Sequence, residues 1–123
     1  MNNPKQVCMR YRFTAAERHL IEKLPLYIQQ HLHLRLTVSK LAALTNLSPH
    51  KLDEGFAVQH GISLSTYIKG CRMALAQTLL RHTEEPIKAV ASRTGYRYKN
   101  FQRQVHRHYH QTAGQIRREA APS

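Results

Sequence analysis

The chain has 123 residues, enough for one small domain or for two very small ones that share a helix. Its formal charge of +12 at pH 7, from 19 Lys and Arg against 7 Asp and Glu, indicates a polyanionic partner such as nucleic acid. No apolar run could span a bilayer, the start of the chain has no secretory pattern, and Cys8 and Cys71 are too few and too distant for a disulfide framework. We therefore expect a cytoplasmic protein without a membrane partner.

The helical pattern begins behind a basic lead-in, residues 1–13, which we expect to be only partly ordered. Thr14 and Glu17 have the spacing of a capping box, in which a hydroxyl and a carboxylate satisfy free N–H groups at the start of a helix. Helical spacing continues in the apolar residues Leu20, Ile21, Leu24, Ile28 and Leu32. Pro25 lies inside this pattern, so it should either kink the helix or begin a second one.

Shorter helices are predicted along the rest of the chain. Ser48 has the hydroxyl expected of a helix cap, and Gly61 and Gly95 are helix breakers. The expected helices cover residues 39–44, 48–60, 63–82, 86–94, 98–109 and 112–119. In the first of these, Leu41 and Leu44 are expected to face the core. Because no segment alternates with period two, the predicted fold class is all-α, with about seven helices.

The chain repeats itself at an offset of 49 residues. The matched pairs are Val38 and Ile87, Leu41-Ala42 and Val90-Ala91, Asn46-Leu47 and Gly95-Tyr96, Leu52 and Phe101, and Phe56 and Val105. In each copy an alanine leaves room for a crossing helix, a residue that tolerates a left-handed turn follows, and two apolar residues four apart anchor the next helix. This pattern predicts a helix-turn-helix, whose second helix keeps one face for the DNA major groove.

A plain helical bundle can also place alanines at helix crossings, so one copy alone would be weak evidence. Two copies in one register, together with the strong positive charge, favour DNA binding over a bundle without a ligand. We therefore predict a first helix-turn-helix subdomain in residues 14–62, a linker helix in residues 63–82 and a second helix-turn-helix subdomain in residues 83–123.

This arrangement resembles the DNA-binding domain of the AraC/XylS family of bacterial transcription regulators over about residues 20–118. In the first half the resemblance is carried by Leu41-Ala42, Leu47-Ser48-Pro49, Lys51-Leu52, Gly55-Phe56, Gly61 and Tyr67-Ile68. Further on it is carried by Arg72-Met73, Ala76, Leu79-Leu80, Ile87, Val90-Ala91, Gly95-Tyr96, Phe101, Arg103, Tyr109 and Arg117. The Lys51-Leu52 and Gly55-Phe56 pairs are similar to the branch of iron-siderophore regulators. This indicates ancestry and not an effector, since we expect no sensor domain here.

The resemblance implies a sequence-specific transcription regulator that binds double-stranded DNA with two recognition helices, joined by the linker helix and inserted into successive major grooves. It also implies binding as a monomer and, in an activator, contact with RNA polymerase. By position, the base-reading residues of the family fall on His50, Asp53 and Glu54 in the first unit and on Lys99, Asn100 and Arg103 in the second.

The two predicted units differ in charge. Residues 37–61 have two lysines balanced by two acids, whereas residues 86–110 have six basic residues and no acid. Because phosphate neutralisation supplies much of the affinity, we expect the second unit to dominate DNA binding. The further DNA contacts expected are Lys51, Arg97 and Arg107. Asp53 and Glu54 either filter out wrong sites by accepting from cytosine or simply face solvent, and both interpretations stay open.

The second half departs from the family pattern. His110 stands where the family has glycine, Ala113 where it has proline and Val105 where it has phenylalanine. One residue fewer separates Gly95 from Phe101, which shifts the start of the recognition helix. These departures leave an alternative function open: a partly degenerate relative that acts as a protein-binding adaptor, for example on RNA polymerase, or as a non-specific DNA binder.

Nine histidines raise the question of a metal site. His106, His108 and His110 lie close together on a predicted helix, but no cysteine or carboxylate lies near them in sequence. Solvated or phosphate-facing histidines are the favoured interpretation, so we predict no metal and no other cofactor. No nucleophile, acid–base pair or phosphate loop forms a motif, so we expect no enzyme activity.

Overall fold

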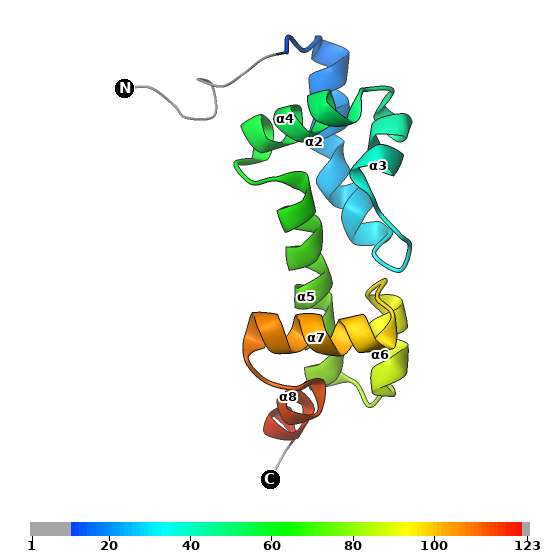
Figure 1. The fold of residues 1–123 in the computed structure, drawn as a ribbon, viewed down its shortest axis with the longest axis vertical. Helices are drawn as coiled ribbons and strands as arrows, with labels where there is room; N and C mark the ends of the chain where they lie inside the picture. The colour runs from blue at the N-terminus through cyan, green and yellow to red at the C-terminus, as the bar shows by residue number, and fades with distance from the viewer. Residues whose placement is uncertain (1–10, 122–123) are drawn as a thin grey trace, which may run out of the picture. The chain divides into compact units, whose positions relative to one another are not determined.

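The computed structural model describes residues 11–121 and shows seven α-helices and no strand in that range (Figure 1). In chain order they are α2 (Ala15–Gln30), α3 (Val38–Thr45), α4 (Pro49–His60), α5 (Leu64–His82), α6 (Ile87–Arg93), α7 (Tyr98–Tyr109) and α8 (Ala113–Ala120). The all-α class predicted from the sequence is thus confirmed. Cys8 and most of the predicted lead-in, residues 1–10, lie outside the described residues. None of the described helices combines the length and the apolar character needed to cross a membrane.

The repeat seen in the sequence extends to whole helices. α2, α3 and α4 begin at residues 15, 38 and 49, and α5, α6 and α7 begin 49 residues later, at 64, 87 and 98. α4 and α7 also end at equivalent positions, His60 and Tyr109. The repeated block therefore contains three helices, one more than the helix-turn-helix itself.

The chain forms two compact units. The first contains the residues up to 31 and residues 36–68, and the second contains residues 32–35 and the chain from 69 onward. Residues 32–35 lie in the connection between α2 and α3, yet they belong to the second unit. The two units are described separately below.

In the first unit, α2 packs against α3 and α4, and α3 packs against α4 (Figure 1). The predicted capping box is confirmed at the start of α2: the Thr14 hydroxyl accepts from the N–H of Glu17, and the Glu17 carboxylate accepts from the N–H of Thr14. The buried apolar side chains are Ile21, Leu24, Ile28, Leu41, Ala42, Leu47, Leu52, Phe56, Leu64 and Ile68. Their removal from water is the main stabilisation of this unit.

Pro25 lies within α2, which continues through it as one helix and does not restart there. A proline has no N–H, so the carbonyl of Ile21, four residues earlier, loses its helical donor. The imidazole of His60, at the end of α4, takes that place with Nε2 3.0 Å from the Ile21 oxygen. Because a carbonyl only accepts, Nε2 carries the proton and donates it. This contact replaces the missing helical bond and holds α4 against α2.

One predicted core residue lies outside the core. Leu41 is fully buried in α3, as expected, but Leu44 is 59% exposed, so its prediction was wrong. The inward face of α3 continues instead from Leu41 to Thr45, four residues on, which is closer to one helical turn. The Thr45 hydroxyl donates to the Leu41 carbonyl at 3.0 Å, and this bond allows a polar side chain to be buried.

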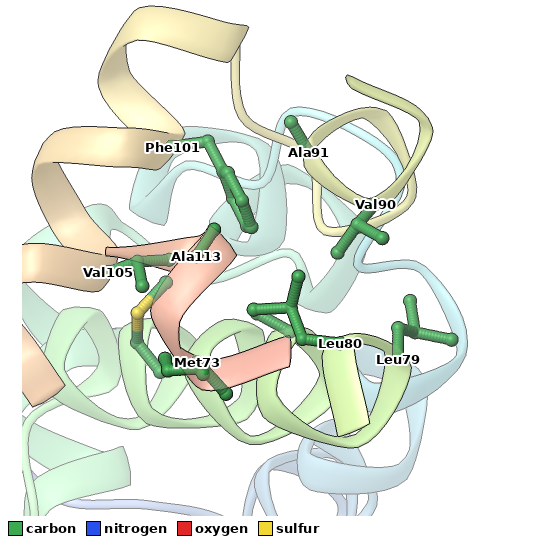
Figure 2. Close-up of a cluster of buried hydrophobic side chains, with 10 residues drawn as sticks. Met73, Leu79, Leu80, Val90, Ala91, Phe101, Val105 and Ala113 are labelled. Atoms are coloured by element: carbon green, nitrogen blue, oxygen red, sulfur yellow. The ribbon is translucent and has the colours of Figure 1, made fainter. Parts of the chain in front are cut away.

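The core of the second unit joins four helices (Figure 2). The contributing residues are Met73, Ala76, Leu79 and Leu80 of α5, Val90 and Ala91 of α6, Phe101 and Val105 of α7, and Ala113 and Ile116 of α8. Figure 2 shows the side chains of Phe101, Leu80 and Val90 pointing toward one another. Ala91 has the small side chain that a helix crossing requires, and it is buried as predicted. The apolar face of α7 is thereby fixed against α5 and α6.

Candidate nucleic-acid interface

The two helix-turn-helix motifs share a left-handed turn but differ in their caps. Asn46 adopts this conformation in the first motif, with φ 58°, and Gly95 adopts it in the second, with φ 83°. The hydroxyl of Ser48 caps α4 by accepting from the N–H of Lys51 at 3.2 Å. Arg97 holds the equivalent place before α7 and makes no side-chain cap. The conformation of the second turn therefore depends on contacts with other residues of the second unit.

That support comes from Arg72 of α5, whose side chain is buried. Its guanidinium donates to the carbonyl of Thr94, at the end of α6, and to the carbonyls of Leu32 and Leu34. The ring of Tyr96 lies 5.4 Å from the guanidinium carbon. Burial lowers the pKa of Arg72 and raises the pKa of Tyr96. Because no carboxylate of residues 11–121 pairs with Arg72, carbonyl dipoles and the ring stabilise its charge.

Gly95 fits closely against this network. A side chain at Gly95 would collide with the guanidinium of Arg72 and with the carbonyl of Leu32. The left-handed backbone at this position also favours glycine. The second turn is thus held in one conformation, and this conformation sets where α7 begins.

Four exposed cations lie along α7 and its N-cap: Arg97, Lys99, Arg103 and Arg107. The buried anchors Phe101 and Val105 hold the opposite face of the helix. Among the described residues, none of the four cations forms an ion pair with a carboxylate. Their charges are therefore available to neutralise the phosphates of a nucleic acid.

Asn100, another predicted DNA contact, is placed differently. It is half-buried, and its Oδ1 accepts from the side-chain amide of Gln104 at 3.3 Å. The other polar atom of that amide, Gln104 Oε1, is buried and has no hydrogen-bond partner among the described residues. Asn100 therefore lies at the side of the exposed surface of α7, whereas Lys99 and Arg103 lie within it.

Two further polar residues are exposed on α7 and were missed by sequence reasoning: Tyr98 and Gln102. His106 and His108, which we expected to face solvent or phosphate, are exposed as well. The Gln102 amide donates to the Tyr98 hydroxyl at 3.0 Å, so these two side chains form one hydrogen-bonding group. Lys88 of α6 lies over the Tyr98 ring, 5.5 Å from its centre. Helical spacing from Lys99 could have indicated Gln102, because residues three apart share a face.

On α4, two of the four predicted DNA contacts are exposed: His50 and Asp53. Lys51 is half-buried instead, and its Nζ pairs with the Glu17 carboxylate at 3.0 Å. The same ammonium group lies 5.3 Å from the centre of the Phe13 ring. The positive charge of Lys51 is thus engaged within the first unit.

Glu54, the fourth predicted contact, is engaged by the segment before α2. The backbone N–H of Tyr11 donates to Glu54 Oε2 at 3.1 Å. Phe13 packs against Gly55, where any side chain would collide with the Phe13 ring. Residues 11–17 therefore contact the first recognition helix. The sequence has no signal for this contact, because it depends on how α2 packs against α4.

The described residues offer no metal centre: no group of three or more His, Cys, Asp or Glu side chains within residues 11–121 is placed to hold an ion. Cys71 is a free, half-buried thiol in α5. The exposed face of α7, with its unpaired cations, is instead suited to a polyanion.

Residues 41–119 match the family model described as a helix-turn-helix domain. This stretch contains both turns and both candidate recognition helices, α4 and α7. The fold and the site thus define a tandem helix-turn-helix domain of the DNA-binding class. The chain belongs to this helix-turn-helix family.

One similar relative is the HTH-type transcriptional activator RhaR of Yersinia pseudotuberculosis, which is 31% identical over 101 residues. The match covers 77% of this chain and 35% of the activator, so the chain spans about a third of that relative's length. Another is the HTH-type transcriptional activator Btr of Bacillus subtilis, 29% identical over 76 residues, or 62% of this chain and 14% of that protein.

Two solved structures have a similar fold. The C-terminal domain of AraT, a response regulator from Geobacillus stearothermophilus, matches with a TM-score of 0.77 and 30% identity over 92% of both chains. The DNA-binding domain of AdpA, solved in complex with a target DNA, matches with a TM-score of 0.75 and 23% identity over 80% of this chain and 90% of that chain. The second likeness concerns the fold alone.

Proposed function

We propose that this chain is a sequence-specific transcription regulator that binds double-stranded DNA by inserting α7, and more weakly α4, into the major groove. The observation that carries the proposal is the set of four exposed, unpaired cations at Arg97, Lys99, Arg103 and Arg107. Arg103 lies opposite the buried anchors and is the proposed base reader, because an arginine can donate twice to guanine. Arg97 and Arg107 are proposed phosphate contacts, and Lys99 contacts either a base or a phosphate.

In the first unit the proposed contacts are weaker. His50 and Asp53 are exposed and free to approach bases. Lys51 and Glu54 would take part only after leaving Glu17 and Tyr11, respectively. Binding is therefore dominated by the second unit.

Several further properties belong to the same proposal. The chain binds DNA as a monomer in the cytoplasm, acts as an activator through contact with RNA polymerase, and has no enzyme activity. The relatives RhaR and Btr are transcriptional activators, and this supports the activator role.

The test is selection of bound duplexes from a random library, followed by affinity measurement at two salt concentrations. Arg103→Ala should weaken binding to the selected site by about 1–3 kcal/mol and relax the preference at one position. Arg118→Ala, an exposed cation on α8, is the matched control and should leave that preference intact. If no sequence is enriched, the chain is not a sequence-specific regulator.

A second candidate function is favoured by the state of α4. Two of its four predicted DNA contacts are engaged by residues 11–17, and Asp53 adds a negative charge to its exposed surface. This surface suits an adaptor that binds a protein, or a non-specific DNA binder that uses α7 alone. Steep loss of binding with salt and no enriched sequence would support the non-specific binder. Binding to RNA polymerase without any DNA affinity would support the adaptor.

A further inference from the structure

Residues 11–17 cover one flank of the first recognition helix, α4. They contact Lys51, Glu54 and Gly55, which lie three and four residues apart and therefore share one face of the helix. Lys51 and Glu54 are both predicted DNA contacts. The flank of α4 that DNA is expected to contact is thus occupied by residues 11–17.

Two features hold this segment against α4. The Phe13 ring packs so closely on Gly55 that a β-carbon there would lie 2.7 Å from it, and the ring centre is 5.3 Å from the Lys51 ammonium group. The capping box fixes the Glu17 carboxylate, which accepts from the N–H of Thr14 at 2.8 Å. The ammonium group of Lys51 is therefore held between an aromatic ring and a fixed carboxylate.

The contact changes the charge that α4 presents. Lys51 is the only Lys or Arg in the sequence of α4, and its Nζ lies 3.0 Å from the Glu17 carboxylate. The Tyr11 N–H that donates to Glu54 is a neutral group, so the negative charge of Glu54 remains. Once Glu17 has neutralised Lys51, the remaining formal charges of α4 at pH 7 are the two acids Asp53 and Glu54, which a polyanion repels.

The internal repeat shows that this arrangement is specific to the first unit. The residues 49 positions after Glu17 and Lys51 are Thr66 and Asn100, and neither carries a charge. The Thr66 hydroxyl accepts instead from the hydroxyl of Ser63 at 2.7 Å. The ion pair on the first recognition helix therefore has no counterpart at the equivalent positions of the second.

We propose that residues 11–17 form an autoinhibitory clasp, which holds Lys51 on the protein and weakens the binding of α4 to DNA. When the clasp opens, Lys51 leaves Glu17 and neutralises one DNA phosphate. This inference rests on the proposed function, because it concerns the regulation of the same DNA-binding surface.

The test compares Glu17→Gln with Glu22→Gln in the full chain. Glutamine at residue 17 keeps the capping box, because its side-chain oxygen still accepts from the Thr14 N–H, but it cannot form an ion pair with Lys51. Glu22 is an exposed acid on the same helix and lies 4.0 Å from His19, so its replacement removes the same charge and leaves the clasp intact. Fluorescence anisotropy measures the affinity for DNA at several salt concentrations, and circular dichroism checks the fold of each variant.

Glu17→Gln should bind DNA about three- to tenfold more tightly than Glu22→Gln near about 0.1 M salt, because Lys51 gains a phosphate contact. The slope of log affinity against log salt should become steeper by about 0.9, the value for one further neutralised phosphate. In a Lys51→Gln background the two variants should bind alike, since no cation is left to be freed. Phe13→Leu, which removes the ring beside Lys51, should tighten binding in the same direction as Glu17→Gln.

A second readout needs no DNA. Acetylation of lysine amines, followed by mass spectrometry, should modify Lys51 more slowly than the exposed Lys40 of α3 in the parent protein. The rate at Lys51 should rise in Glu17→Gln and stay unchanged in Glu22→Gln, because only the first variant opens the clasp.

The proposal is overturned if the parent binds DNA and Glu17→Gln binds no more tightly than Glu22→Gln, or if the gain persists in the Lys51→Gln background. It is also overturned if Lys51 and Lys40 are acetylated at the same rate in the parent. The proposed function fails in a different way, when no sequence is enriched, and the salt comparison can then still be made on any duplex that the parent binds. If neither the parent nor Glu17→Gln binds any duplex, both proposals are wrong.

Discussion

The buried guanidinium of Arg72 shows how a single side chain can support a recognition helix that it does not touch. It fixes the turn that precedes the uncapped start of α7, by donating to the carbonyl of Thr94 at the end of α6. Its partners are carbonyls and not carboxylates, so the contact depends on geometry more than on charge pairing.

Replacing Arg72 should therefore lower the stability of the fold. Arg72→Met leaves the carbonyls of Leu32, Leu34 and Thr94 without their donor, and we expect the free energy of unfolding to fall by about 2–4 kcal/mol. Urea denaturation followed by circular dichroism measures the change. Arg81→Met, an exposed arginine on the same helix, should stay within about 0.5 kcal/mol of the parent. Equal stability of the two variants would contradict the supporting role of Arg72.

His110 ends α7 in a conformation that costs energy. Its φ of 59° lies in the left-handed region, which residues with a Cβ atom rarely adopt. His110→Gly should raise the free energy of unfolding by about 1 kcal/mol, because glycine adopts this conformation freely. His108→Gly, within the same helix, should lower it by about 1 kcal/mol, since glycine weakens a helix interior. A thermal melt of both variants checks the opposite signs, and a destabilised His110→Gly would show that the imidazole itself is needed.

Among the elements, α2 lacks one backbone hydrogen bond, and a side chain of α4 provides a substitute. Pro25 removes the donor for the Ile21 carbonyl, and His60 supplies a new one. His60→Leu should cost about 1–3 kcal/mol of unfolding free energy, because it leaves a buried carbonyl unpaired. In a Pro25→Ala background the helix itself supplies that donor, so the same change should cost clearly less. A double-mutant cycle by urea denaturation measures the coupling, and additive effects would remove His60 from this role.

The ionised Glu17 carboxylate at the start of α2 makes a pH-dependent contribution to the free energy of unfolding. The N–H of Thr14 first, and Lys51 next, hold the pKa of the Glu17 carboxyl below its usual 4.5. A carboxyl whose pKa is lower in the folded state stabilises the fold above its unfolded pKa, and this contribution disappears as the pH falls through the folded pKa. The parent should therefore be more stable than Glu17→Gln near pH 7, with the difference shrinking below about pH 4.5. Denaturation at several pH values tests this, and a difference that stayed constant into acid would exclude the charge of Glu17 as its source.

The boundaries of most helices could be predicted from local signals alone. Thr14, Ser48, Gly61 and Gly95 each act through neighbouring backbone groups, and the structure places them at helix ends as expected. The exposure of Leu44 could not be predicted in this way. Thr45 faces the core instead, because its hydroxyl is bonded to the Leu41 carbonyl of the same helix. Local patterns record capping and periodicity, whereas the choice between two candidate inward residues depends on the helix that packs against them.

The candidate site was predictable to a similar degree. The cations of α7 were predicted from the family resemblance and from the charge of residues 86–110, and the structure exposes them to solvent. The engagement of Lys51 and Glu54 by residues 11–17 did not follow, since contacts distant in sequence leave no periodic trace. These contacts become visible only when the packing of α2 against α4 is known.

For the whole molecule, the charge of +12 should make salt act in opposite directions on folding and on binding. Screening reduces the repulsion among the chain's own charges, so the Tm of the free protein should rise with salt. Affinity for DNA should fall by about a thousandfold between about 50 and about 200 mM salt if six or more phosphates are neutralised. Differential scanning fluorimetry and fluorescence anisotropy measure the two trends. A fall in affinity of less than about tenfold would mean that the cations of α7 make few phosphate contacts.

Because the two repeated blocks share one register, the outward faces of α4 and α7 occupy equivalent positions on equivalent supports. α4 and α7 have equal lengths, and each is anchored at the same two positions, Leu52 and Phe56 in one and Phe101 and Val105 in the other. The outward residues of one helix can therefore be grafted onto the other while every anchor stays in place. A duplicated scaffold of this kind allows the DNA preference of either recognition helix to change, by evolution or by design, while the buried residues that anchor the helix stay the same.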